Sequence, residues 1–188
     1  VNAGYCSSVC CMYTAKEAVI AKEHDPGVSC TVFCIDERAH GKHFDRYVER
    51  AVNEGVRYIR SSVSGVKELQ QSKSLLISFI DGTGMQTQEE FDMAVLAVGM
   101  RPAPRSAELS EKFGISLNEF GYCATGELDA VRTSREGVFV AGAWQSPKDI
   151  PDSVTQGGAA ACDAMSVLAE ARGTCIEPEV LPPERDIA

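Results

Sequence analysis

The sequence predicts an α/β fold with a mainly parallel sheet. Segments with helical and strand periodicity alternate along the chain, and the run VSCTVFCID, Val28–Asp36, is β-branched and almost uniformly apolar. A strand that is apolar on both faces suits a buried parallel sheet better than an exposed antiparallel one. The expected order is helix, strand, helix, strand, β-hairpin and strand, and then a last strand and helix.

The first half of the chain gives clear boundaries for its helices. Apolar residues recur at helical spacing over Val9–Glu23, and a turn, HDPG, follows from His24. After the strand comes a second amphipathic helix, from about His43 to Glu54, closed by Gly55. Residues 56–69 then have the composition of strands.

A hairpin and a buried strand follow. Residues 74–92, SLLISFIDGTGMQTQEEFD, predict a hairpin around the turn DGTG. The next run, Asp92–Pro104, predicts a short buried strand that ends at Gly99 and a proline-rich crossing. We interpret that crossing as the exit from a subdomain.

The second half has fewer regular elements. A short helix is expected at residues 106–113, ended by a turn at Gly114, and a buried strand at Glu136–Ala143. The last helix should run from about Pro151 to Arg172, with proline in its first turn and Gly173 at its end. The proline-rich, acidic tail, residues 175–188, is expected to be loose.

Length and composition exclude several classes of protein. With 188 residues and 44% hydrophobic side chains, the chain can build one ordinary core or two small subdomains. Its net charge of -9 and scattered basic residues argue against nucleic acid as a partner. No apolar run approaches the roughly 20 residues of a membrane helix, and the start lacks the features of a signal peptide. We therefore expect a cytoplasmic protein without direct membrane insertion, excised from a longer chain because Val1 is not a natural start.

Among the eight cysteines, only Cys6, Cys10 and Cys11 in CSSVCC have the spacing of metal ligands. Three interpretations remain open for them: a metal site, a redox dithiol, or small residues packed under a sheet. A helix N-terminus favours thiolates and anionic clusters. By contrast, Cys30 and Cys34 fall on one face of a strand, which favours core packing.

One element of a nucleotide-binding fold is missing, because no strand precedes the first helix. The segments CTVFCIDER, GVRYIRSSV and FDMAVLAVGMRP nevertheless resemble the nicotinamide-nucleotide subdomain of the two-domain flavoprotein disulfide reductases. In that family TSREGVFVAGA would return the chain to the FAD domain. The following helix would point its N-terminus at the flavin, where free N–H groups stabilise negative charge.

A closer resemblance covers roughly Tyr5–Arg172. CSSVCCMYTAKEAVIAKE, GVRYIR and VFVAGAWQSPKDIPDSVTQGGAAA together resemble the A subunit of heterodisulfide reductase and its relatives, which include the A subunit of the quinone-interacting membrane-bound oxidoreductase complex. The resemblance implies an FAD-dependent oxidoreductase that carries [4Fe-4S] clusters and passes electrons among partner subunits. It makes Cys6, Cys10 and Cys11 cluster ligands, with a fourth cysteine about a dozen residues upstream.

The resemblance also implies domain boundaries. Residues 1–98 would form an NAD(P)-binding-like subdomain whose phosphate loop is replaced by the cysteine cluster. Residues 99–174 would form the returning part of the FAD domain, with its C-terminal strand and helix, and residues 175–188 a loose tail. Without the upstream segments, the cofactors of this fragment are expected to be absent or incomplete.

Flavin contacts are expected around PKDIPDSV. The family's Gly-Asp after the returning strand is Gly142-Ala143 here, so contacts would come from backbone groups and from the segment that opens the last helix. The candidate cofactor-binding residues are Gly142, Lys148, Asp149, Ile150, Asp152 and Ser153. The same residues also fit an ordinary helix N-cap, in which Asp152 or Ser153 accepts hydrogen bonds from first-turn N–H groups.

The leading hypothesis is therefore a fragment of a flavin and iron–sulfur electron-transfer protein like the A subunit of heterodisulfide reductase. One alternative is a non-catalytic module that docks onto other subunits. Another is a thiol-redox or zinc-binding domain that uses the same three cysteines without iron. Oligomerisation is possible under each hypothesis, and the electron donor and acceptor are left open.

Overall fold

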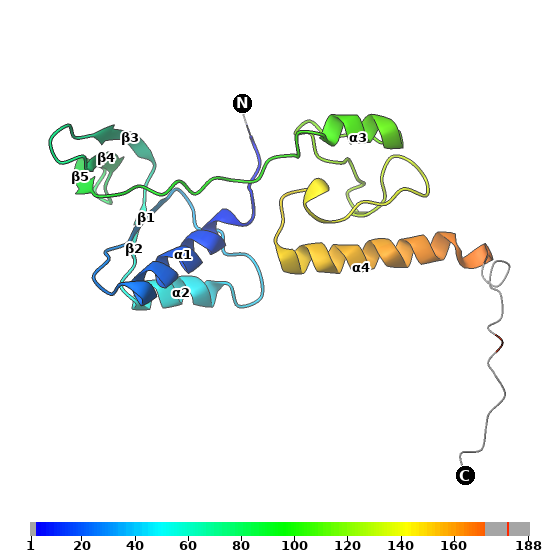
Figure 1. Cartoon of the computed structure of the whole chain (residues 1–188), viewed down its shortest axis with the longest axis horizontal. Helices are drawn as coiled ribbons and strands as arrows, with labels where there is room; N and C mark the ends of the chain where they lie inside the picture. The colour runs from blue at the N-terminus through cyan, green and yellow to red at the C-terminus, as the bar shows by residue number, and fades with distance from the viewer. Residues whose placement is uncertain (1–2, 172–179, 181–188) are drawn as a thin grey trace, which may run out of the picture. The chain divides into compact units, whose positions relative to one another are not determined.

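A parallel pair of strands covered by two helices opens the fold. The computed structural model describes residues 3–171 and Val180, and Figure 1 shows its elements. Helix α1 (Cys10–His24) leads to β1 (Thr31–Cys34), and α2 (Asp45–Asn53) leads to β2 (Arg57–Arg60). The two strands pair in parallel from Thr31 opposite Arg57 to Cys34 opposite Arg60. Helix α1 contacts α2, and this arrangement is a βαβ unit with a further helix before its first strand.

The core of this part is small and lies under the two helices. Val19 of α1, Ala51 of α2 and Val56 are buried against one another. Partly buried apolar residues of α1, β1 and β2 pack around them. Gly55 closes α2 with a φ of 83°, a left-handed conformation that glycine adopts without strain, as the sequence predicts.

An antiparallel meander follows. It consists of β3 (Val63–Glu68), β4 (Leu75–Ile80) and β5 (Gln86–Phe91), hydrogen-bonded in that order. The predicted DGTG turn lies between β4 and β5. Phe33 of the parallel pair packs against Phe79 of β4, with ring centroids 4.9 Å apart.

The remaining described elements are helical. They are α3 (Ser106–Phe113), the 3-10 helix η1 (Gly142–Trp144), α4 (Ile150–Val167) and the 3-10 helix η2 (Ala169–Ala171). The segments between these helices supply a core of Ile115, Cys123 and Val140, with Trp144 of η1 packed against it. The predicted turn at Gly114 ends α3 in the left-handed conformation, with φ 65°.

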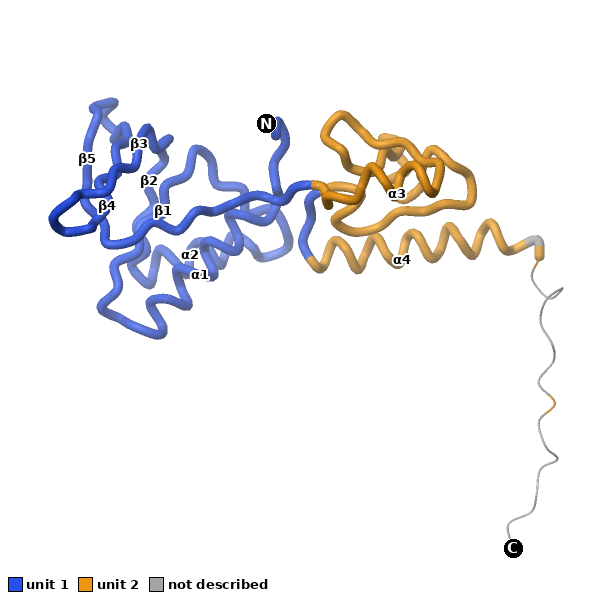
Figure 2. Tube along the Cα trace, turned by 45° about the horizontal axis from the view of Figure 1, so that its top comes forward, with its two compact units in different colours: residues 1–101, 147–149 blue, residues 102–146, 150–188 orange. Residues whose placement is uncertain are grey.

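The chain divides into two compact units, coloured separately in Figure 2. The first consists of Val1–Arg101 with Pro147–Asp149, and the second of Pro102–Ser146 with Ile150–Ala188. The functional assignments of residues 1–98, 99–174 and 175–188 stay predictions. Most of the last segment, with Arg172 and Gly173, lies outside the described residues.

The α/β class is confirmed, but the expectation of a mainly parallel sheet is wrong. The parallel sheet has two strands, and the larger sheet, of three strands, is antiparallel. The apolar run Val28–Asp36 contributes only β1, because residues outside Thr31–Cys34 find no ladder partner among the described residues.

Two predicted buried strands are also absent from the described part of the chain. Residues 92–98 pair with no strand, and the side chains of Val95, Leu96 and Val98 are 75%, 78% and 68% exposed. Within residues 136–143, the β-pairing in the described structure is a single antiparallel bridge between Phe139 and Arg132. Val140 in this segment is nevertheless buried. An apolar run becomes a strand only when a neighbour accepts and donates its backbone hydrogen bonds.

Candidate functional site

The three clustered cysteines lie where a loop enters α1. Cys6 is exposed in the loop, while Cys10 and Cys11 are partly buried as the first residues of the helix. Ser8, between them, has a φ of 61°, which a residue with a side chain rarely adopts. We call residues 5–11 the thiol loop. All seven cysteines in the described part of the chain are free.

Backbone N–H groups point at two of the sulfur atoms. The Ser8 N–H donates to Cys6 Sγ at 3.4 Å, and the Arg38 N–H donates to Cys11 Sγ at 3.4 Å. The nearby Cys6 sulfur, more than the attraction to Asp36, raises the pKa of Arg38. The loop after β1 therefore contacts the Cys11 thiol through its backbone.

The pKa of the Cys11 thiol is raised. Burial is the largest cause, the Arg38 N–H opposes it, and the neighbouring Cys10 adds to it. A raised pKa lowers the fraction of thiolate at neutral pH, and the thiolate is the nucleophile of a redox dithiol. The same protonation also has to be reversed before Cys11 can ligate a metal, so this pKa does not separate the redox and metal alternatives.

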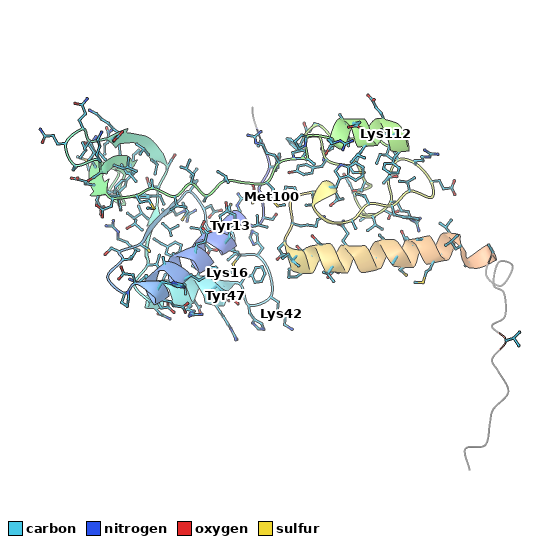
Figure 3. The ribbon with its side chains drawn as sticks, viewed as in Figure 1. Tyr13, Lys16, Lys42, Tyr47, Met100 and Lys112 are labelled. Carbon is cyan, nitrogen blue, oxygen red and sulfur yellow. The ribbon has the colours of Figure 1, made fainter. Side chains whose placement is uncertain are left out.

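The thiol loop is anchored on the segment that follows the meander. Tyr5 Oη donates to the carbonyl of Met100 at 3.0 Å, and the Met100 N–H donates to Ser7 Oγ at 3.1 Å. Tyr13 Oη donates to the carbonyl of Val98 (Tyr13 and Met100 are labelled in Figure 3). A Cβ on Gly99 would clash with Ser7 Oγ, so any other residue there would force the Ser7 hydroxyl to move.

One further side chain lies near the Cys11 thiol, and no motif in the sequence indicated it. Tyr58 of β2 has a buried hydroxyl without a hydrogen-bond partner in the described structure. Burial raises its pKa, and the nearby Cys34, Glu37 and Cys11 add to the rise. Cys34, predicted as a core residue, is only partly buried. The βαβ order predicted from the sequence was the one indication that these residues would lie near the thiols, because this topology brings the ends of strands to the start of a helix.

The thiols have the chemistry of a cluster site without its closed geometry. Sulfur donors with N–H groups directed at them are typical of iron–sulfur ligand sets. Among the described residues, however, no group of three or more His, Cys, Asp or Glu side chains is arranged to hold a metal ion. The assignment of Cys6, Cys10 and Cys11 as metal ligands stays a prediction.

The predicted flavin contacts are divided between the two units. Lys148 and Asp149 group with the first unit, while Gly142, Ile150, Asp152 and Ser153 belong to the second. Ile150, Asp152 and Ser153 occupy the first turn of α4.

Gly142 lies beside that first turn. It has a φ of 73°, and a Cβ built on it would lie 3.7 Å from Ser153 Oγ. Its N–H donates to Gln156 Oε1 at 2.8 Å, and Gln156 Nε2 donates to the Ala130 carbonyl at 2.8 Å. Gln156 of α4 therefore links the backbone at Gly142 to the helix. No sequence motif indicated this residue.

Comparison with known proteins decides the family. Residues 3–161 match the family described as "Pyridine nucleotide-disulphide oxidoreductase". The chain belongs to this family. In keeping with that, the chain resembles the solved structure of LpdA from Mycobacterium tuberculosis with a TM-score of 0.52 and 17% identity, over 91% of this chain and 34% of that one. At this identity the likeness concerns the fold alone.

Curated relatives confirm the predicted resemblance to the A subunit of heterodisulfide reductase. A protein of Archaeoglobus profundus, named as similar to that A subunit, is 38% identical over 88% of this chain and 24% of its own length. An iron–sulfur A subunit of CoB–CoM heterodisulfide reductase from Methanopyrus kandleri is 38% identical over 97% of this chain and 28% of its own length. The chain thus spans about a quarter of these relatives. In addition, the described residues contain no helix long and apolar enough to cross a membrane.

Proposed function

We propose that this oxidoreductase chain is the part of a heterodisulfide reductase A-type subunit that joins a flavin to an iron–sulfur cluster. The observation that carries the proposal is the thiol loop, where three thiols meet a helix N-terminus and N–H groups point at Cys6 and Cys11. A relative that is 38% identical is named as an iron–sulfur protein, which supports the same chemistry. Cys6, Cys10 and Cys11 would be three of the cluster's ligands.

The flavin side of the proposal rests on Gly142 and the first turn of α4. A left-handed glycine lets the backbone approach a planar ring, and the positive end of the α4 dipole favours negative charge near the first turn. Gly142, Ile150, Asp152 and Ser153 would supply these contacts, and Lys148 and Asp149 further polar ones. Bound FAD would exchange electron pairs with a two-electron donor and release single electrons to clusters.

The remaining assignments follow the same proposal. Residues 1–98 would be a nucleotide-type subdomain adapted to the cluster, residues 99–174 the end of the FAD domain, and residues 175–188 a tail. The protein would work in the cytoplasm within a complex of several subunits. The name of another relative, the A subunit of an "H(2):CoB-CoM heterodisulfide,ferredoxin reductase", supports such a complex.

Anaerobic iron–sulfur reconstitution tests the cluster assignment. The protein, at its full encoded length, should take up iron and sulfide and gain broad thiolate-to-iron charge-transfer absorption. Cys6→Ala and Cys10→Ala should each lower the iron content. Cys162→Ala is the matched control, because Cys162 is also free and exposed but lies on α4.

Two outcomes would contradict the cluster assignment. One is no iron uptake by the wild type, and the other is equal iron content in Cys10→Ala and Cys162→Ala. Metal analysis that finds stoichiometric zinc in place of iron would favour the zinc-binding alternative, since three thiolates and one more ligand also suit zinc.

Flavin retention tests the flavin-binding part of the proposal. The full-length protein should purify yellow or retain added FAD, and Gly142→Ala should weaken retention because alanine is strained at a φ of 73°. Gly84→Ala, at a φ of 84° in the hairpin turn, is the control for a strained glycine elsewhere. A colourless protein that fails to bind FAD would count against the flavin assignment.

A further inference from the structure

The exposed apolar segment, residues 93–98, has the composition of a buried strand but pairs with no strand in the described structure (Figure 1). Val95 and Leu96 are neighbours in this segment, and their side chains are 75% and 78% exposed. Successive side chains of an extended segment point to opposite sides, so both faces of this one are apolar and uncovered. Apolar residues on both faces are typical of a central strand in a parallel sheet.

A parallel sheet with an open edge lies in the same unit. Strand β1 pairs with β2 along one edge, and its other edge has no strand partner among the described residues. Helix α1 leads into β1. A helix that leads into a strand of a parallel sheet normally follows another strand of that sheet, because the two strands and the helix form a right-handed crossover. Residues 3–9, the described part of the chain before α1, contain no such strand.

Contacts at its two ends align the exposed apolar segment with β1. Just before the segment, the ring centroid of Phe91 lies 5.8 Å from that of Phe33 in β1. At the end of the segment, the Val98 carbonyl accepts a hydrogen bond from the Tyr13 hydroxyl near the start of α1. The loop after β1 reaches the same end of α1, where it donates a backbone hydrogen bond to the Cys11 thiol. The segment and β1 therefore both run toward the start of α1, as two strands of one parallel sheet do.

We propose that a strand of the same polypeptide, encoded just upstream of Val1, pairs in parallel with the open edge of β1 and with the exposed apolar segment. The 188 residues span about a quarter of the length of their relatives, so the longer protein has residues to supply this strand. A second copy of the chain could cover the segment but could not supply the strand that leads into α1. The pairing involves backbone and apolar side chains only, so it is independent of the cofactors in the proposed function.

Amide hydrogen exchange of the wild-type protein at its full encoded length tests whether the segment is paired. Peptides that cover residues 93–98 should exchange as slowly as β4, the central strand of the meander, because strand pairing and burial protect N–H groups. The exposed turn at residues 70–72, between β3 and β4, is the internal control and should exchange at least about 100-fold faster. Exchange of residues 93–98 at the rate of this turn would overturn the proposal.

Photo-crosslinking of the full-length protein identifies what covers the segment. Val95→p-benzoylphenylalanine and Leu96→p-benzoylphenylalanine place the crosslinker on opposite faces, and at least one should link to residues encoded within roughly 20 positions upstream of Val1, the length of a strand and its loop. Val66→p-benzoylphenylalanine is the matched control, because Val66 is an exposed apolar residue of β3 and should give no such link. Links only to other parts of the polypeptide or to a second copy, or no link above the control, would overturn the proposal.

Discussion

A single carboxylate organises the hairpin turn. Asp81 Oδ1 accepts hydrogen bonds from the Thr83 N–H at 2.8 Å, the Thr83 hydroxyl at 2.6 Å and the Met85 N–H at 3.0 Å. Asp81 Oδ2 accepts one from the Thr87 hydroxyl at 3.1 Å. These donors, led by the Thr83 hydroxyl, lower the pKa of Asp81 to about 2. The sequence predicts a turn at the DGTG motif. The structure shows that hydrogen bonds to the aspartate side chain hold this turn together.

The depressed pKa gives a pH prediction with a definite sign. The folded-state pKa lies below the unfolded value of about 3.9, so Asp81 stabilises the fold above pH ~4. That contribution should disappear as the pH falls from about 4 through about 2. Carboxyl NMR should give a midpoint near 2, and Thr83→Ala should raise it. A midpoint near 4 in the wild type would contradict the assigned bonds.

Gly99 lies in close contact with Ser7 of the thiol loop. Gly99→Ala should destabilise the protein by about 1–3 kcal/mol, since the new Cβ would clash with Ser7 Oγ. Ser7→Ala removes that oxygen, so the double variant should recover part of the loss. Urea denaturation of both single variants and the double variant measures the coupling. Strict additivity would argue against the contact.

At the scale of elements, α4 is attached by side-chain hydrogen bonds. None of its residues is buried in the described structure, which is unusual for a helix of 18 residues. Gln156 bonds Gly142 and Ala130, and Arg132 Nε donates to Asp163 at 2.8 Å. A helix that buries so little depends on such bonds for its position.

Gln156→Ala should therefore loosen α4. We expect a loss of about 1 kcal/mol in the free energy of unfolding, the usual net value of a hydrogen bond of this kind. Ser166→Ala is the control, because Ser166 Oγ bonds to the Cys162 carbonyl of its own helix. Chemical denaturation followed by circular dichroism should separate the two, and equal midpoints would contradict the role of Gln156.

At the scale of the whole molecule, the exposed apolar segment, residues 93–98, is the main departure from an ordinary surface. Met93, Val95, Leu96 and Val98 are all largely exposed on an extended stretch. Unpaired extended backbone with apolar side chains is a template for association.

The isolated chain should therefore self-associate as its concentration rises, and Leu96→Lys should reduce this. Leu128→Lys is the matched control, since Leu128 is fully exposed outside that segment. Light scattering over a concentration series gives the measurement. A wild-type chain that stays monomeric throughout, or equal effects of the two variants, would contradict the prediction.

The helices, the hairpin and the family could be predicted from the amino-acid sequence. Those features depend on local periodicity, on glycine at left-handed positions such as Gly55 and Gly114, and on motifs that stand in one order. Whether Asp92–Pro104 and Glu136–Ala143 become strands was decided only in the folded chain, because strand pairing requires a partner distant in sequence. The fold alone also placed Arg38 and Tyr58 beside the thiols, since parallel pairing joins residues more than twenty positions apart.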